Sequence, residues 1–154
     1  MRIADLLQPE AIEADLSASN KPGLIRELVG LVLRVDPTLD PNQLVDTLLV
    51  RERLQSTGIG DGVAIPHGRT DAVGRALAVF GRSRVGVDFQ SLDGAPTHLF
   101  FGLLVPGAQH GLHLKALARV TRLLKEAAIR QALLDAPDAG ALYQILMTED
   151  ARLS

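Results

Sequence analysis

The segment GIGDGVAIPHGR, residues 58–69, carries the strongest backbone constraints in the sequence. Its three glycines within five residues allow positive φ angles or a close approach to another chain. The apolar run 63–65 contains two β-branched residues and is typical of a buried strand. Pro66 fixes its own φ and has no N–H to donate. We therefore expect the strand to end at Pro66.

His67 follows this expected strand end directly. The rigid ring of Pro66 precedes it, and Gly68 follows it without a side chain. We expect the missing side chain of Gly68 to leave room for a bulky group beside the imidazole. This setting makes His67 the first candidate for a functional residue.

Outward from this segment, the apolar spacing alternates between helical and strand periods. We expect an edge strand near residues 11–16 and a helix that begins at Asn20-Lys21-Pro22 and ends at Asp36-Pro37. A second helix is expected to begin at Asp40-Pro41, with Asp40 as its cap, and to stop at Gly58. Three further strands and three further helices are then expected at residues 77–80, 85–89, 98–105, 112–126, 127–134 and 139–147.

The strand expected at 98–105 is apolar at nearly every position, as is typical of a central strand covered on both faces. Helices precede, interrupt and follow the strands, so the pattern predicts an α/β layer fold. With 154 residues, the chain is long enough for one domain, residues 1–154, with a sizeable core.

Composition excludes several classes of function. A formal net charge of −2 and an aromatic content of 3% argue against a nucleic-acid binder, which needs a basic face and bases stacked on aromatic rings. The sequence has no cysteine, so disulfides and thiolate metal sites are excluded. No apolar run approaches the roughly 20 residues that span a bilayer. We expect a cytoplasmic protein without direct membrane insertion.

The sequence has four histidines, and three of them lie near expected loops. His98 begins an expected strand and is most simply a polar strand-end residue. His110 and His113 lie at the start of the helix after the central strand, and His67 also follows a strand. Ligands of α/β sheets gather beyond the carboxyl ends of strands, so a meeting of His67 with His113 is plausible.

The sequence lacks the characteristic motifs of three other kinds of site. A three-histidine zinc site is possible, but there is no His-Glu-x-x-His spacing, and we expect no metal and no cofactor. The glycine segment lacks the Lys-Ser/Thr ending of a phosphate-binding P-loop. A serine hydrolase is disfavoured because the sequence has no Gly-x-Ser-x-Gly elbow.

The remaining possibility is that histidine itself is the nucleophile. A neutral imidazole has a free nitrogen lone pair that can attack phosphorus. The phosphoryl oxygens then need donors, because phosphoryl transfer depends on positioning and charge stabilisation. Candidate donors are the Arg51 guanidinium, the Ser56 and Thr57 hydroxyls, the backbone N–H groups of the glycine segment and a second imidazole, His113.

The sequence resembles the enzyme IIA domains of the phosphotransferase system, of the fructose/mannitol and nitrogen-regulatory type. The resemblance rests on Arg51-Glu52, on residues 56–60 and 62–68, and on the later segments 104–106 and 113–118. It implies that His67 accepts phosphate, with His113 and Arg51 beside it as phosphate-binding residues. Ser56, Thr57 and Gly68 are further candidates for contacting the phosphate. His110 is an extra histidine in this segment, so which imidazole faces His67 is left open.

The resemblance also implies a three-layer α/β/α fold with a mixed sheet of about five strands. The phosphate donor would be the histidine phosphocarrier protein HPr or its nitrogen-branch paralogue. Since the sequence shows no fused IIB or membrane segment, we expect a regulator that binds target proteins according to its phosphorylation state. The first alternative is a sugar-specific IIA that passes phosphate to a IIB component, and the second is a non-catalytic interaction module.

Overall fold

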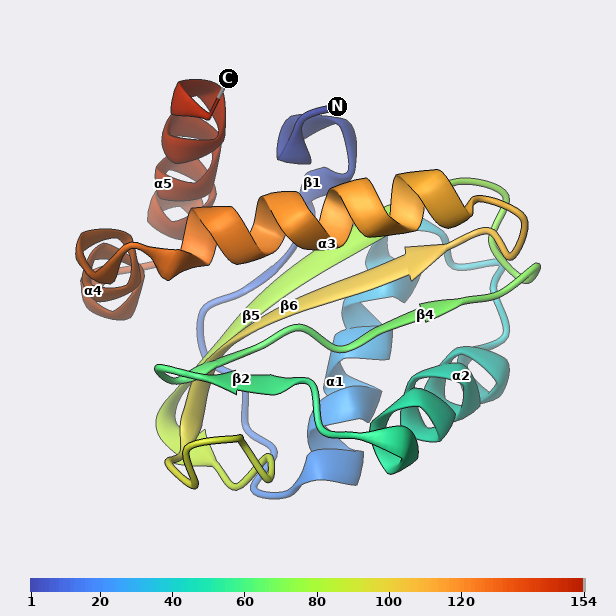
Figure 1. Ribbon diagram of the computed structural model, residues 1–154, viewed down its shortest axis with the longest axis horizontal. Helices are drawn as coiled ribbons and strands as arrows, with labels where there is room; N and C mark the ends of the chain where they lie inside the picture. The colour runs from blue at the N-terminus through green and yellow to red at the C-terminus, as the bar shows by residue number, and fades with distance from the viewer. Residues whose placement is uncertain (154) are drawn as a thin grey trace.

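The computed structural model describes residues 1–153, which form a mixed sheet covered by helices on both faces (Figure 1). The sheet has six strands, and its main path runs in the order β1-β5-β6-β3-β2. The strands are β1 (Leu7–Glu13), β2 (Gly58–Gly60), β3 (Val63–Ala64), β4 (His67–Arg69), β5 (Leu77–Val87) and β6 (Thr97–Val105). The expected three-layer fold is confirmed, with β4 as one strand beyond the five of the main path.

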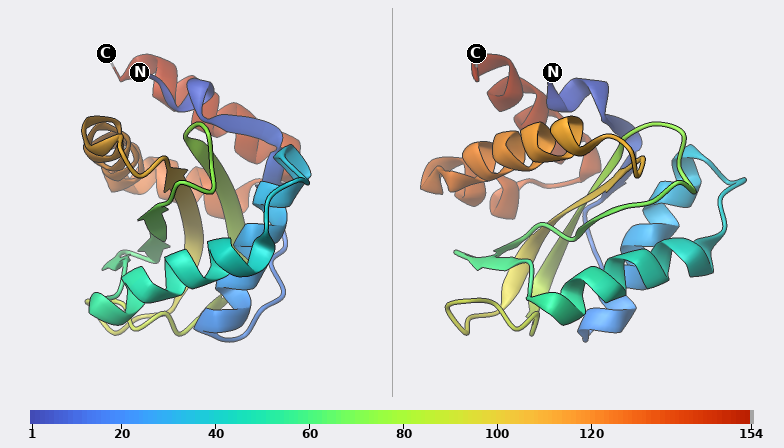
Figure 2. Two further views of the ribbon diagram at one scale, coloured as in Figure 1. Left: turned by 90° about the vertical axis from the view of Figure 1, so that its right-hand side faces the viewer. Right: turned by 45° about the vertical axis from the view of Figure 1, so that its right-hand side comes forward.

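Helices α1 (Lys21–Val35) and α2 (Pro41–Leu54) cover one face of the sheet. Helices α3 (His110–Lys125), α4 (Ala127–Asp135) and α5 (Ala139–Arg152) lie on the other face, and a short 3-10 turn, Ile3–Asp5, precedes β1 (Figure 2). The edge strand expected near 11–16 begins earlier, at Leu7, and pairs parallel to β5. The order of the helices follows the apolar pattern, whereas strands β2 and β4 were not expected.

The first two helices begin where their capping residues predict. The Asn20 side chain accepts a hydrogen bond from the Gly23 N–H at 2.8 Å, and the Asp40 side chain accepts one from the Asn42 N–H at 3.0 Å. Each bond satisfies one of the free N–H groups at a helix start. Helix α2 ends at Leu54, short of the expected stop at Gly58, because Gln55 is already extended. Leu54, the last residue of this helix, is exposed and does not contribute to the core.

Strand β5 is a single strand where two short strands, 77–80 and 85–89, were expected. Residues 81–84 continue it because Nε and Nη1 of the Arg82 side chain find acceptors inside the protein. The guanidinium of Arg82 donates to the carbonyls of Ala14, Leu133, Leu134 and Ala136, and the residue is fully buried. An internal set of acceptors thus compensates for burying a charge.

The glycines of the segment 58–69 form a hairpin and not a phosphate-binding loop. Strand β2 pairs antiparallel to β3 around Asp61-Gly62, and both of these residues have positive φ. Asp-Gly is favoured in two-residue hairpin turns for this reason. The Asp61 N–H donates to the Asp93 carboxylate at 3.1 Å, so the turn packs against the 91–96 loop. The Asp61 N–H and the Gly58 N–H, which donates to Ser56 Oγ, are therefore used within the protein.

The strand that begins at Val63 ends at Ala64, and the chain rejoins the sheet at His67. Only Ile65 and Pro66 lie between β3 and β4. Strands β3 and β4 both run parallel to β6, and the Leu103 N–H donates to the Pro66 carbonyl at 2.9 Å. Proline lacks a donor but keeps its acceptor, so the chain continues along β6. His67 is therefore the first residue of β4 and does not lie beyond the end of the strand segment.

The core lies on both sides of β6, which is buried at every position except His98. Phe80, Phe100 and Phe101 are fully buried, and each contributes roughly 1.5–3 kcal/mol by leaving water. At one end of the molecule, the Arg119 guanidinium pairs with the buried Asp150 carboxylate, which also accepts from the Ala4 N–H. Within residues 1–153, no helix is long and apolar enough to span a membrane.

Candidate functional site

The His67 side chain is held by a hydrogen bond within its own segment. Its Nδ1 lies 2.7 Å from the Ile65 carbonyl oxygen. A carbonyl oxygen only accepts, so Nδ1 carries the proton and Nε2 keeps the free lone pair. The geometry thus selects one tautomer of neutral His67.

His113 is the imidazole that faces His67. The two ring centroids are 5.2 Å apart, with the rings at 89° to each other. Helix α3 begins just beyond the carboxyl end of β6, and β4 ends beside the same point because it is parallel to β6. The parallel register therefore brings two histidines together that are far apart in the sequence.

Both facing histidines are neutral at pH 7. Burial lowers the pKa of His67, and the nearby Arg51 charge lowers it too, against opposing effects of the Ile65 hydrogen bond and the Glu52 charge. Burial also lowers the pKa of His113 to about 4, with further contributions from His67, Arg69, His110 and Arg51. Among residues 1–153, no group hydrogen-bonds the buried Nδ1 of His113.

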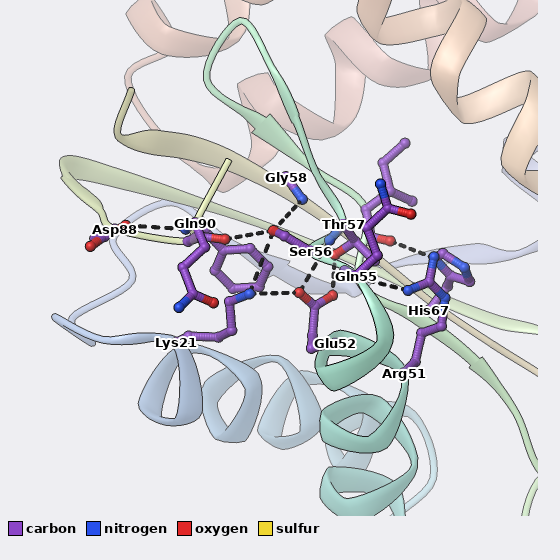
Figure 3. Close-up of polar contacts among 12 residues, drawn as sticks. Lys21, Arg51, Glu52, Gln55, Ser56, Thr57, Gly58, His67, Asp88 and Gln90 are labelled. Carbon is purple, nitrogen blue, oxygen red and sulfur yellow. Dashed lines mark hydrogen bonds and ion pairs between the residues drawn. The ribbon is translucent and has the colours of Figure 1, made fainter. Parts of the chain in front are cut away.

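His67 and His113 open into a pocket of about 670 Å³ on the protein surface. Its polar lining contains, besides the two histidines, the nitrogen-bearing side chains of Arg51, Arg69 and His110, together with Thr47 and one carboxylate, Asp46. Arg51 comes from the last turns of α2, and its Nη1 donates to the Gln55 carbonyl at 2.8 Å. Figure 3 shows the Arg51 side chain extending toward His67. The pocket thus has the donors and the charge that suit an anion.

Arg69 is a pocket residue that the sequence pattern did not identify, and His110 is the extra histidine whose position the sequence left open. The Arg69 guanidinium contacts the His110 ring and lies 3.4 Å from the Gly107 carbonyl. His110 is the exposed first residue of α3 and contacts Arg69, whereas the ring that faces His67 is that of His113. The alternation of side chains along β4 is the signal that places Arg69 on the same side as His67.

The Ser56 and Thr57 hydroxyls are used inside the protein. Ser56 Oγ donates to the Phe89 carbonyl at 2.6 Å and accepts from the Gly58 N–H. Thr57 is buried, and both its hydroxyl and its N–H donate to the Glu52 carboxylate. Both residues border a smaller pocket with His67, but their hydroxyls hold the local structure. This differs from the expectation that they contact phosphate.

Gly68 has a packing role besides the one expected of it. A Cβ atom at this position would lie 2.7 Å from the Thr47 side chain of α2. The missing side chain therefore admits α2 against β4, and Gly68 also lines the pocket beside His67. Within the described residues, no cluster of three or more His, Cys, Asp or Glu side chains is arranged to hold a metal ion.

Comparison with known families agrees with this combination of fold and paired histidines. Residues 5–148 match the family model described as "Phosphoenolpyruvate-dependent sugar phosphotransferase system, EIIA 2". The chain belongs to this family of phosphotransferase-system IIA proteins. The resemblance read from residues 51–68 and 104–118 is thereby confirmed.

Individual relatives fall into regulatory and sugar-transport types. A nitrogen regulatory protein of Bradyrhizobium diazoefficiens is 38% identical over 146 residues, which cover 95% of each chain. The fructose-specific EIIABC component of Bacillus subtilis is 37% identical over 97% of this chain, which spans only 24% of that longer protein. The crystal structure of the nitrogen regulatory protein IIA-Ntr from Neisseria meningitidis superposes with a TM-score of 0.87 at 36% identity, covering 94% of this chain and 98% of that one.

Proposed function

We propose that this protein is a phosphocarrier that accepts a phosphoryl group on Nε2 of His67. The hydrogen bond from Nδ1 to the Ile65 carbonyl carries the proposal, because it leaves the Nε2 lone pair free. Nε2 attacks the phosphorus of a phosphohistidine on the donor protein. A new N–P bond forms, the donor N–P bond breaks, and the donor imidazole keeps the bonding electron pair.

The surrounding side chains support this step electrostatically. Attack by Nε2 places positive charge on the His67 ring, and the Ile65 carbonyl that accepts from Nδ1 stabilises that charge. The Arg51 guanidinium offers N–H donors to the phosphoryl oxygens. The low pKa of His113 keeps its imidazole neutral at pH 7, so His113 brings no additional proton to the site.

The rim of the pocket suits a protein as phosphate donor. Three apolar side chains at the rim, Val50, Leu54 and Leu114, are 48%, 79% and 68% exposed. Exposed apolar groups that surround a polar centre are characteristic of protein interaction sites. We infer that the donor is HPr or its nitrogen-branch paralogue and that it docks on this rim in the cytoplasm.

A regulatory role is favoured over sugar transport. Two nitrogen regulatory relatives are 38% and 36% identical to this chain along nearly their whole length, whereas a fructose-specific EIIA component that is matched over 94% of its length is 34% identical. A phosphoryl group adds about 1.5 to 2 negative charges to the pocket, which changes the set of proteins that it attracts. The alternative, transfer to a IIB component, is supported by the similarity to fructose-specific proteins.

Intact mass spectrometry tests the proposal. The protein is incubated with phosphoenolpyruvate, enzyme I and either HPr or the nitrogen-branch paralogue, and His67→Ala is treated in parallel. One acid-labile phosphate on the wild type and none on the variant is expected. If neither donor labels the folded wild type, the protein is an interaction module.

A second step separates regulation from sugar transport. The phosphorylated protein is mixed with candidate IIB proteins, and the loss of phosphate is followed over time. Slow loss to every IIB is expected of a regulator. Rapid and selective transfer to one IIB would establish the sugar-specific alternative.

A further inference from the structure

We propose that Glu52 is a positioning residue for His67, acting through a chain of hydrogen bonds that runs from Lys21 to the imidazole. The chain passes from the Lys21 ammonium to the Glu52 carboxylate, then through the Thr57 and Ile65 backbone to His67 Nδ1. The inference rests on the proposed function, since it concerns how the accepting nitrogen is prepared.

Glu52 is buried among partners that satisfy its charge. Its side chain is 3% exposed, and that of Lys21 is 13% exposed. One carboxylate oxygen accepts from Lys21 Nζ at 2.9 Å and from the Thr57 N–H at 3.1 Å, and the other accepts from the Thr57 hydroxyl. Figure 3 shows this carboxylate between Lys21 and Thr57. A buried carboxylate with this many donors has one fixed orientation.

The Thr57 backbone links the Glu52 carboxylate to the segment that holds His67. The Thr57 carbonyl accepts from the Ile65 N–H at 3.0 Å, and the Ile65 carbonyl accepts from His67 Nδ1 at 2.7 Å. Pairing with β6 is interrupted between Ala64 and His67, so Ile65 is outside the sheet ladder. The Thr57 contact therefore sets the direction of the Ile65 carbonyl, and that carbonyl selects the tautomer of His67.

Lys21 holds the other end of the chain in place. Its Nζ lies 4.4 Å from the centroid of the Phe89 ring and 3.5 Å from Ser56 Oγ. Because Phe89 is fully buried, the ammonium is held against a rigid surface. Helix α1 is thereby connected to a site that its own residues do not line.

Arg51 and Glu52 are neighbouring residues of α2 whose side chains extend to different places. Arg51 extends to the pocket with His67, and Glu52 extends to Lys21 on the other side of the 55–58 segment (Figure 3). Their charges also act in opposite directions on the pKa of His67: that of Arg51 lowers it and that of Glu52 raises it. Asp46 from α2, Arg69 from β4 and His113 and His110 from α3 are the other charged or titratable groups that line this pocket.

The competing explanation is that Glu52 only stabilises the fold. Buried ion pairs differ widely in what they contribute to stability, so a loss of stability alone would not show positioning. A matched control exists in Asp150, whose carboxylate is 1% exposed and pairs with Arg119 at 2.6 Å. That ion pair makes no contact with the pocket.

The experiment compares Glu52→Gln with Asp150→Asn by ¹⁵N NMR of the histidine rings and by the rate of phosphoryl acceptance. In unphosphorylated Glu52→Gln, we expect His67 to lose its single Nδ1–H tautomer and its pKa to fall further. Acceptance should slow on the order of tenfold, as is common when a residue that orients a functional side chain is removed. Asp150→Asn should keep the tautomer, the pKa of His67 and the rate, whatever its melting temperature.

An unchanged tautomer and rate in folded Glu52→Gln would overturn the positioning role. If Glu52→Gln does not fold, Thr57→Val removes one contact to the carboxylate, and a shift of the tautomer in the same direction, but smaller, is expected. An unchanged His67 tautomer in Thr57→Val would then overturn the inference. The NMR measurement needs no phosphate donor, so it decides this inference even if the wild type is never labelled.

Discussion

His67 and His98 have almost the same local contact and very different surroundings. Each donates from Nδ1 to a backbone carbonyl, His67 to Ile65 at 2.7 Å and His98 to Ser83 at 2.8 Å. Each is also half-buried near the start of a strand. A selected tautomer is therefore not enough to make a functional site.

The difference lies at the opposite edge of each ring. The Nε2 edge of His98 is packed so closely on Gly86 that a Cβ there would lie 3.0 Å from Nε2. His67 instead borders an open pocket with His113 and two arginines. The open pocket and its cationic side chains distinguish His67 from His98.

The largest expected effect is a direct test of this comparison. We expect His67→Gln to lose all phosphate labelling and His98→Gln to keep it, because of these two histidines only His67 borders the pocket with His113 and the two arginines. Intact mass after incubation with the donor proteins measures both. Labelling of His67→Gln but not of His98→Gln would reverse the assignment of the two histidines.

Substitutions of two arginines near the end of α2 test whether a cationic donor of the pocket assists phosphoryl acceptance. We expect Arg51→Ala to slow acceptance by about 10²-fold, the magnitude typical of removing one donor to a transition-state oxyanion. Arg53→Ala is the matched control, since Arg53 lies in the same last turns but does not border the His67 pocket. Circular dichroism should show both variants folded. Equal rates for the two variants would remove Arg51 from the site.

His113 is expected to matter less than Arg51. We expect His113→Ala to slow phosphoryl acceptance by roughly tenfold without abolishing it, because that ring assists a transfer that occurs on His67. Rapid-quench labelling measures the rate. A His113→Ala protein that cannot be labelled, with a His67→Ala protein that can, would make His113 the nucleophile.

Acidification should act on both the rate and the stability. Because the pKa of His67 is below its ordinary 6.5, acceptance should persist as the pH falls through 6.5 and decline only at lower pH. His113 binds a proton near pH 6.5 when unfolded and at about 4 when folded. The unfolded state therefore holds more protons in this window, and stability falls as the pH decreases from 6.5 toward 4. Urea unfolding at pH 7 and pH 5 measures the loss, which should be smaller in His113→Ala.

The smallest effect concerns the packing beside His67. We expect Gly68→Ala to destabilise the fold by about 1–3 kcal/mol, because the new Cβ would overlap the Thr47 methyl group. Thr47→Ala should recover part of this loss in the double variant. Thermal unfolding of the three variants measures the coupling, and simple additivity would show that the two residues do not compete for space.

Much of the fold follows from local patterns. The caps at Asn20 and Asp40 and the apolar run of β6 each act within one element, so the sequence alone predicts them. The Asp61-Gly62 turn was equally readable, yet the glycines around it suggest a loop for a ligand. The continuity of β5 was not readable, because the acceptors of Arg82 come from residues 14 and 133–136.

The site divides in the same way. The sequence determined that His67 is held next to Pro66 and that Arg51 and His113 are its candidate partners, since these follow from short motifs. Only the tertiary structure decided that His113 and not His110 faces His67. It also decided that the Thr57 N–H and hydroxyl donate to the Glu52 carboxylate. Those choices depend on the parallel register of β4 with β6 and on the burial of one carboxylate between two helices. The contacts of His67 with His113 and of Lys21 with Glu52 join residues far apart in the sequence, so they leave no periodic trace in the chain.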